Sequence, residues 1–274
     1  MNGIAFGQYY PAKSILHKLD PRMKIILALL YIVTSFLCTN VFSFLLLLLS
    51  AVFLILVSRI PMRIIYKSLK AIIFILIFTA VLNIFWTSDN ENAPLFSWWI
   101  IKIYKSGLYN AAFIVIRIIS MIIGTGLFLT YTTTPIQLTD GLEQLLSPLK
   151  LFKVPVHEFA MMMTIALRFI PTIIEETEKI MSAQKARGAD FTSGSIVKRA
   201  RALIPILIPL FISAFRRAGE LATAMTCRCY RGGEGRTKLN VLKFSFRDFL
   251  ALAVVILFGT AIILINIYGY GYTM

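Results

Sequence analysis

Long apolar runs alternate with short polar segments along the chain, and this pattern predicts helices that cross a membrane. Residues 25–57 form an apolar run longer than one crossing needs, because about 20 residues span the hydrocarbon layer. A polar interruption at 38–40 divides this run, so we expect one span at 24–38 and a second at 41–58. The same pattern predicts further spans at 71–86, 107–130 and 249–268.

The composition agrees with a membrane protein. The 274 residues are 58% hydrophobic and only 15% charged, which is far from the average of soluble domains. The net charge of +15 comes from bases in the connecting segments, which is typical of a cytoplasmic face beside anionic lipid and disfavours nucleic acid as a partner. Basic residues in the segment 59–70 therefore predict a cytoplasmic amino terminus and, after five spans, a carboxyl terminus outside.

Residues 131–248 have a different character, with 17 bases and 10 acids interleaved with apolar residues. The helical patterns of this region cover residues 136–149, 156–188 and 195–232. Three prolines fall inside the patterns and should bend the helices: Pro171, Pro205 and Pro209. The apolar piece 203–215 is short and has bases on both sides, so we expect it to lie along the inner leaflet or on a partner instead of spanning.

These patterns predict an all-α integral membrane protein of about five transmembrane helices, with a set of long cytoplasmic helices inserted before the last span. The expected domains are 1–130, with four spans, 131–248, with the cytoplasmic helices, and 249–274, with the final span.

The sequence contains no motif of an enzyme. A phosphate-binding glycine loop, a Ser/His/Asp set and a metal cluster with ligand spacing are all missing, so we expect no catalysis and no cofactor bound by this chain. Cys227 and Cys229 have the spacing of a metal-binding pair. Both histidines are far from them in the sequence, which favours two small thiols at a helix end.

Arg117 lies inside a predicted span, where an ionised group is costly and is usually paired. One interpretation is a residue that lines a substrate path, which would make the chain a stand-alone permease or channel. The other is an arginine that faces the bundle interior and pairs with a carbonyl. A membrane-bound enzyme of lipid metabolism is a further alternative.

Two arginines each end a long helical pattern in the cytoplasmic region. Arg187 stands directly before Gly188, and glycine after a helix allows the left-handed turn that ends it. The planar guanidinium can offer a bidentate face to a carboxylate of another chain. A single such arginine is most simply a helix-end cation, but Arg187 together with Arg228 suits a partner that has two equivalent sockets.

The pattern at 156–188 also contains consecutive methionines at 161–163. Methionine adapts to irregular partners, so a face used against several proteins is one interpretation, although core packing explains most such residues. Glu175, Glu176 and Glu178 are expected to form a solvated helix face.

Several stretches together resemble a known family. These are the opening GQYYPAKSILHKLDPRMKIIL and the stretch DGLEQLLSPLKLFKVPVHEFAMMMTIALRFIPTIIEE followed by AQKARGADF. They are similar to the transmembrane T component, or EcfT family, of the energy-coupling factor transporters, which take up vitamins and metal ions in prokaryotes. The first Ala-Arg-Gly signature falls on Ala186, Arg187 and Gly188.

The second signature departs from the family pattern, with Cys227, Arg228 and Cys229 where the family usually has another Ala-Arg-Gly. The arginine is kept. The helix ending that glycine would supply at 229 is then expected from Gly232 or Gly233.

The resemblance implies a scaffold that couples two ABC-type ATPases to an S component, the small membrane protein that holds the substrate. ATP would be bound by the ATPases, which would dock on the two signatures. The S component would lie against the other side of the coupling helices, a contact assigned to Met161, Met162, Met163 and Phe169. The substrate belongs to another chain, and the methionines favour a T component shared among several S components.

Overall fold

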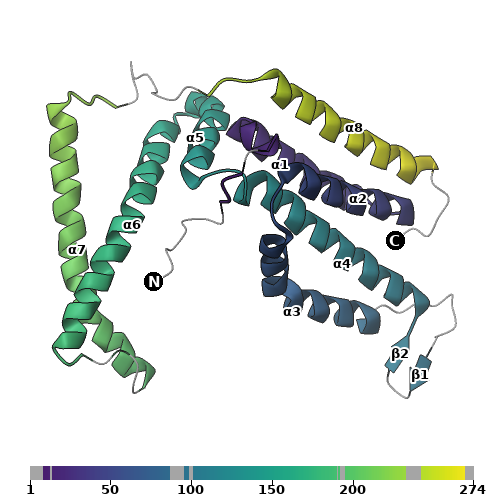
Figure 1. Ribbon diagram of the computed structural model, residues 1–274, viewed down its shortest axis with the longest axis horizontal. Coiled ribbons are helices and arrows are strands. Elements are labelled where there is room, and N and C mark those ends of the chain that lie inside the picture. The colour runs from purple at the N-terminus through teal and green to yellow at the C-terminus, as the bar shows by residue number, and fades with distance from the viewer. Residues whose placement is uncertain are drawn as a thin grey trace. The chain divides into compact units, whose positions relative to one another are not determined.

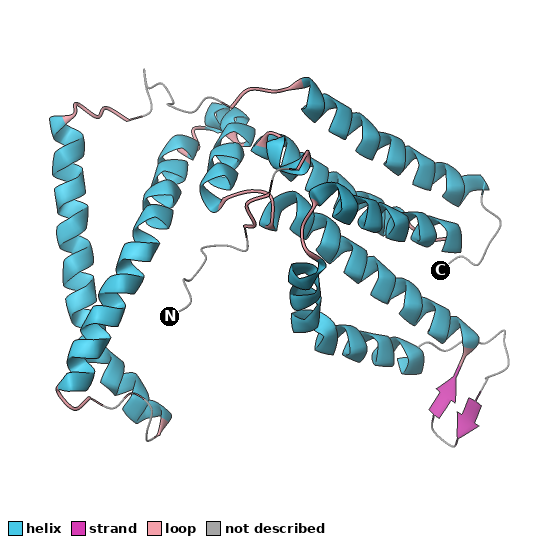
Figure 2. Cartoon of the chain, in the orientation of Figure 1, coloured by secondary structure: helices cyan, strands magenta, loops and turns pink. Residues whose placement is uncertain are grey.

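The computed structural model describes residues 9–12, 14–86, 96–98, 101–189, 191, 195–232 and 242–268. Figures 1 and 2 show a chain built almost wholly of helices with one small hairpin, so the predicted all-α class is confirmed. The helices are α1 (Pro21–Leu37), α2 (Val41–Ser58), α3 (Met62–Trp86), α4 (Lys105–Thr125), α5 (Pro135–Leu145), α6 (Val156–Ala186), α7 (Ile196–Cys227) and α8 (Phe246–Tyr268). Short helical turns occur at η1 (Leu16–Lys18), η2 (Gly126–Thr130) and η3 (Ser147–Phe152). Strands β1 (Phe96–Trp98) and β2 (Ile101–Ile103) pair antiparallel.

The chain forms two compact units. The first contains residues 1–145 and 241–274, and the second contains residues 146–240. Helix α5 is part of the first unit, whereas α6 and α7 make up most of the second.

Most predicted spans match helices closely. Helix α2 has the predicted bounds, and α1 and α8 each begin three residues before the predicted start. Helix α3 differs, because it begins at Met62 and not at 71. Ile65 is buried in the core of the first unit, and Ile64 and Leu69 pack against the same cluster, so the basic segment has an apolar face to bury and continues the helix instead of forming a loop. Figure 1 shows that α3 changes direction along its length.

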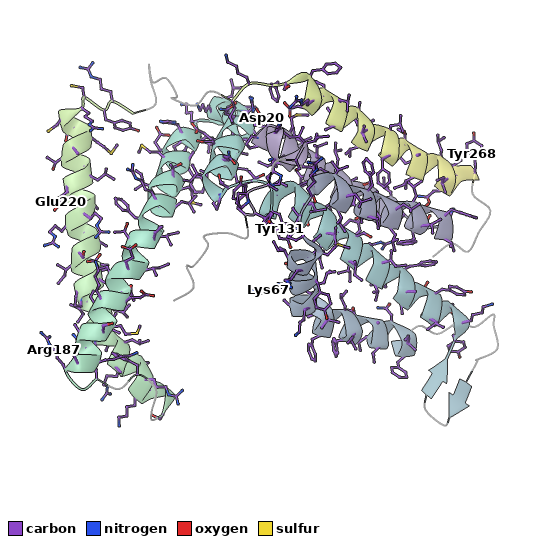
Figure 3. The ribbon with its side chains drawn as sticks, viewed as in Figure 1. Asp20, Lys67, Tyr131, Arg187, Glu220 and Tyr268 are labelled. Atoms are coloured by element: carbon purple, nitrogen blue, oxygen red, sulfur yellow. The ribbon has the colours of Figure 1, made fainter. Side chains whose placement is uncertain are left out.

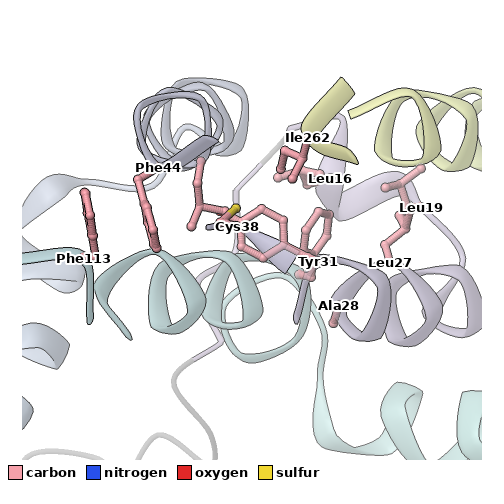
Figure 4. Packing of buried hydrophobic residues seen from close by; sticks show 11 residues of the cluster. Leu16, Leu19, Leu27, Ala28, Tyr31, Cys38, Phe44, Phe113 and Ile262 are labelled. Carbon is pink, nitrogen blue, oxygen red and sulfur yellow. The ribbon is translucent and has the colours of Figure 1, made fainter. Parts of the chain in front are cut away.

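The core of the first unit surrounds α1. Tyr31 is 2% exposed, contacts the Phe128 ring edge-on and stacks on Phe258 of α8. Gly124 of α4 leaves no room for a side chain beside the Tyr31 ring, so α4 packs closely on α1 there. Figure 4 shows this cluster, in which Phe44 of α2 stacks on Phe113 at 4.6 Å between ring centroids. Aromatic rings and aliphatic side chains thus together join the helices of the first unit.

Six described helices are long and apolar enough to cross a membrane: α2, α3, α4, α6, α7 and α8. Helix α1 is shorter, with 17 residues, although the sequence pattern makes it a span. Helices α6 and α7 reach spanning length, although we expect them on the cytoplasmic side. Length and composition alone do not place a helix relative to the membrane, so that expectation stays a prediction.

The second unit is a pair of long helices that contact each other. Figure 1 shows α6 and α7 crossing, with their carboxyl ends at opposite ends of the pair. Pro205 and Pro209 lie inside α7, and the helix is visibly bent in its first half. A proline inside a helix removes a backbone hydrogen bond and tilts the helix axis, which explains the bend.

Candidate functional site

Helix α6 ends in a hydrogen-bonded turn that exposes Arg187. The Gly188 N–H donates to the Lys185 carbonyl at 3.0 Å, and the Ala189 N–H donates to the Gln184 carbonyl at 3.0 Å. Gly188 has φ +84°, a left-handed conformation that glycine adopts without strain. These two bonds and this conformation form the Schellman motif, so the predicted helix ending is confirmed.

Helix α7 ends in the same way around Arg228. The Cys229 N–H donates to the Thr226 carbonyl at 2.9 Å, and the Tyr230 N–H donates to the Met225 carbonyl at 3.0 Å. Cys229 takes the left-handed position itself, with φ 54°. The expectation that Gly232 or Gly233 would end the helix is therefore wrong, because the turn closes before either residue is reached; Gly233 lies outside the described residues.

The two signature arginines have nearly the same backbone geometry. Arg187 has φ −87° and ψ 9°, and Arg228 has φ −93° and ψ 18°. Both residues are exposed, as are their neighbours Ala186, Gly188, Cys227 and Cys229. The partial negative charge at a helix carboxyl end favours a cation there, so each arginine is stable without a partner and available to one. We call these two exposed helix ends the Arg187 tip and the Arg228 tip.

The tips lie at opposite ends of the second unit. Figure 3 labels Arg187 at one end of α6, and Figure 1 shows α7 finishing at the other end of the helix pair. The arrangement places one signature arginine at each end of the α6–α7 pair, so two separate partners can each reach one tip.

An ion pair joins α6 to α7 between the two tips. The Arg217 Nη2 atom lies 2.8 Å from the Glu176 Oε2 atom, and both side chains are about a quarter exposed. The same guanidinium lies 5.7 Å from the Phe169 ring centroid. Glu175 and Glu178 are exposed, as expected of a solvated face, whereas Glu176 is partly buried at the helix crossing and pairs with Arg217. Nothing in the sequence pairs it with a residue 41 positions away.

A mainly apolar cavity of about 240 Å³ lies beside this ion pair, between α6 and α7. Its α6 side includes Ile165, Phe169 and Ile173, which stand four residues apart and so share a helix face. That spacing is the sequence feature from which the cavity could have been predicted. Met162 precedes Phe169 by seven residues and lies on the same side of α6, whereas Met161 and Met163 point to other sides of the helix. The contact of these four residues with an S component stays a prediction.

Arg117 serves the packing of the first unit. Its Nη2 donates to the Cys38 carbonyl at 2.7 Å, and the guanidinium lies 5.2 Å from the Phe44 ring centroid. The interpretation in which the arginine pairs with a carbonyl is confirmed. The contact ties α4 to the turn between α1 and α2 and satisfies a carbonyl at the end of α1.

The cysteines beside Arg228 are free and exposed. Among the residues that the structure describes, no three His, Cys, Asp or Glu side chains gather in a group that could hold a metal ion.

Comparison with known proteins identifies the family. A family profile named CbiQ, described as "Cobalt transport protein", matches residues 12–239. An "Energy-coupling factor transporter transmembrane protein EcfT" of Clostridium kluyveri is 54% identical over 248 residues, which cover 90% of this chain and 91% of the relative. The chain belongs to the EcfT family. EcfT proteins of Ruminiclostridium cellulolyticum and Bacillus subtilis are 51% and 49% identical, over 96% and 90% of this chain and 97% and 92% of the relatives.

The family resemblance seen in the sequence is thereby confirmed. The chain is a T component of an energy-coupling factor transporter, a multi-pass membrane subunit of the EcfT kind.

Proposed function

We propose that this EcfT-family chain is the coupling subunit of an ATP-driven importer, in which two ABC-type ATPases dock on the Arg187 and Arg228 tips. ATP is bound by those partners, and the chain itself is not catalytic and binds no cofactor. The observation that supports the proposal best is the repeated geometry of the two tips, each with an exposed arginine at the C-cap, directly before a left-handed residue.

Each tip is suited to an acidic socket. A guanidinium in the open gains only about 0 to 1 kcal/mol from a surface ion pair. A charge-assisted hydrogen bond to a carboxylate is worth about 1.5–3 kcal/mol once the pair is enclosed. The exposed arginines therefore contribute most when another chain covers them, and a carboxylate in a groove is the complementary partner.

The tips are also evenly placed about the helix crossing. Arg187 follows Glu176 by 11 residues, and Arg228 follows Arg217 by 11 residues, so each tip lies roughly 16 Å along its helix from the ion pair. Movement of either ATPase would act on a lever of the same length. This symmetry supports a role in which two similar partners drive one crossing.

The remaining partner is an S component that carries a micronutrient, either a vitamin or a metal ion. The coupling helices would contact it through apolar side chains that α6 leaves exposed or partly exposed: Met161, Met162, Met163 and Phe169. Motion of the tips would pass through α6 and the bent α7 to this chain. We further propose a cytoplasmic amino terminus, which places the tips on the side where ATP is present.

The proposal is tested by co-purification of the ATPases from native membranes. Changing Arg187→Glu and Arg228→Glu together should reduce the recovered ATPase at least about tenfold, since two charge-assisted contacts become repulsive. The matched control is Arg199→Glu with Arg201→Glu, which makes the same charge change at two exposed arginines of the first turns of α7. Unchanged recovery with the tip variant, or equal loss with the control, would contradict the proposal.

A further inference from the structure

The first turn of α1 binds the beginning of α8. Asp20 is the N-cap of α1, and its side chain accepts a hydrogen bond from the Arg22 N–H at 2.9 Å. Its own backbone N–H donates to the Asp248 Oδ1 atom at 2.8 Å. Asp248 is 1% exposed, so this bond lies in the interior of the first unit. A hydrogen bond to a buried carboxylate is among the stronger bonds in a protein.

The second carboxylate oxygen of Asp248 accepts a hydrogen bond from the start of its own helix, α8. The Ser245 N–H donates to Asp248 Oδ2 at 2.7 Å, which is the carboxylate half of a capping box. One buried side chain therefore fixes the start of α8 and joins it to a turn that is 228 residues away in the sequence. Both carboxylate oxygens have a backbone donor, so the side chain has one defined position.

The same turn of α1 holds the segment that leads into and forms α5. Lys24 is 2% exposed, and its Nζ donates to the Thr132 carbonyl at 2.9 Å. A Cβ added at Gly141 of α5 would lie 3.1 Å from the Pro21 Cβ, so α5 packs directly on the first turn of α1. Glycine at 141 permits this close approach.

The first turn of α1 also contacts Phe244, which lies just before α8. The Arg22 guanidinium lies 3.8 Å from the centroid of the Phe244 ring, while its Nη2 donates to Asp20 Oδ2 at 2.8 Å. A cation over an aromatic ring and a carboxylate pair together orient the guanidinium. Four charged side chains, two acidic and two basic, thus balance one another in this part of the first unit: Asp20, Arg22, Lys24 and Asp248.

The chain leaves the first unit after Leu145 and returns to it at Val241. Helix α5 is the last element before the departure, and α8 with Phe244 is the first described part after the return. Both connections to the second unit are therefore attached to one turn of α1. We propose that this turn is a clamp, made by Asp20, Arg22, Lys24, Gly141 and Asp248, through which the coupling helices move the membrane bundle, and that Asp248 is its key positioning residue.

The clamp rests on the proposed function, because it assumes that the second unit is moved by ATPases. Its physical basis is that a buried network of charged hydrogen bonds is rigid and cannot yield gradually. A displacement of α5 or of the start of α8 then displaces α1 too, because the clamp joins them. Helix α1 lies in the core of the first unit, so the displacement reaches the other helices packed on it. The sequence motif Leu-Asp-Pro-Arg at 19–22 thereby gains a role in transmission.

The test uses the whole complex with its ATPases and S component in lipid nanodiscs. Amide hydrogen exchange is compared with and without MgATP and vanadate. In the unaltered complex we expect the nucleotide to change exchange in α6, in α7 and in residues 246–262 of α8. With Asp248→Asn, which cannot accept both backbone bonds, the changes in α6 and α7 should stay within about twofold of normal while the change in α8 is lost.

Asn266→Ala is the matched control, because Asn266 accepts from Ser43 Oγ at 2.6 Å near the far end of α8, away from either connection. It should leave transmission to residues 246–262 intact. Transmission that persists in Asp248→Asn, or that is lost equally in Asn266→Ala, would overturn the clamp while the ATPases remain bound. Failure of the unaltered chain to bind ATPases would instead overturn the proposed function.

A second variant provides the test if the Asp248→Asn chain does not assemble with the ATPases and the S component. Gly141→Ala changes none of the hydrogen-bonding side chains of the clamp, but its methyl group would lie 3.1 Å from the Pro21 Cβ, so α5 must shift slightly against the first turn of α1. It should also uncouple α8 from the nucleotide-driven change. Normal transmission in Gly141→Ala would overturn the clamp.

Discussion

Glu176 of α6 and Arg217 of α7 lie 2.8 Å apart and form the polar contact at the crossing of the two long helices. Each is followed 11 residues later by a signature arginine. The ion pair and the two tips thus make one arrangement, in which a central contact stands equally far along each helix from two exposed cations.

The ion pair should tolerate exchange of its charges. Glu176→Arg or Arg217→Glu alone places like charges together, and each should lower the free energy of unfolding by about 1 kcal/mol, since both side chains are partly exposed. The double variant restores opposite charges and should recover most of that loss. Thermal unfolding of the solubilised chain measures all three variants, and a double variant no more stable than the single ones would contradict this account of the crossing.

Exchanging the left-handed residues of the two tips should change the stability of the two helix ends in opposite directions. Cys229→Gly removes a left-handed cysteine and should stabilise the end of α7 by about 1 kcal/mol. Gly188→Cys makes the reverse change at the end of α6, where nothing lies within 4 Å of an added Cβ, and should cost about as much. Amide exchange of residues 225–230 and 184–189 reports each effect. A Gly188→Cys variant as stable as the unaltered chain would show that backbone conformation does not decide the helix end.

Removing Arg117 should destabilise the bundle without affecting the docking of ATPases. Arg117→Ala leaves the Cys38 carbonyl without its guanidinium donor, and we expect a loss of about 1–3 kcal/mol in the free energy of unfolding. Arg117→Lys retains a donor and should lose less. ATPase recovery from membranes should remain within about twofold of normal, because the residue belongs to the packing of the first unit. Selective loss of transport with unchanged stability would instead favour a substrate path at Arg117.

Two glycines inside helices should behave in opposite ways. Gly124→Ala forces a methyl group against the Tyr31 ring and should cost about 1–3 kcal/mol. Gly219→Ala in α7 adds a methyl group with nothing within 4 Å and should stabilise the helix by up to about 1 kcal/mol. Unfolding midpoints of the two variants provide the comparison. Equal effects would mean that α4 does not approach α1 as closely as described.

Features that depend on local sequence were predictable. The apolar runs located α2 and α8 within three residues, and Gly188 after Arg187 indicated how α6 ends. The spacing of apolar residues and a glycine after a helix are read from neighbouring positions, so one sequence suffices for them.

Features that depend on tertiary contacts were not predictable from the pattern. The sequence predicts a solvated acid at Glu176, because its partner Arg217 is 41 residues away. The link between Asp20 and Asp248 likewise joins residues that are 228 positions apart. The sequence does not indicate Cys229 as the left-handed residue, because a left-handed cysteine is uncommon, although two backbone hydrogen bonds close the turn there. The segment before residue 71 is helical because Ile65 and Leu69 pack into the core of the first unit, a tertiary contact that its basic residues do not reveal. Strands β1 and β2 lie in the segment between the spans expected at 71–86 and 107–130, where the apolar pattern does not indicate a hairpin.

Site-specific photo-cross-linking shows whether each tip touches its own ATPase. A benzophenone amino acid placed at position 186 or 227, beside each arginine, is activated in native membranes, and position 199 serves as a control on the same coupling helices. We expect adducts with an ATPase from 186 and from 227, carried by two different ATPase subunits, and none from 199. Adducts only with lipid or with the S component at 186 and 227 would contradict this expectation.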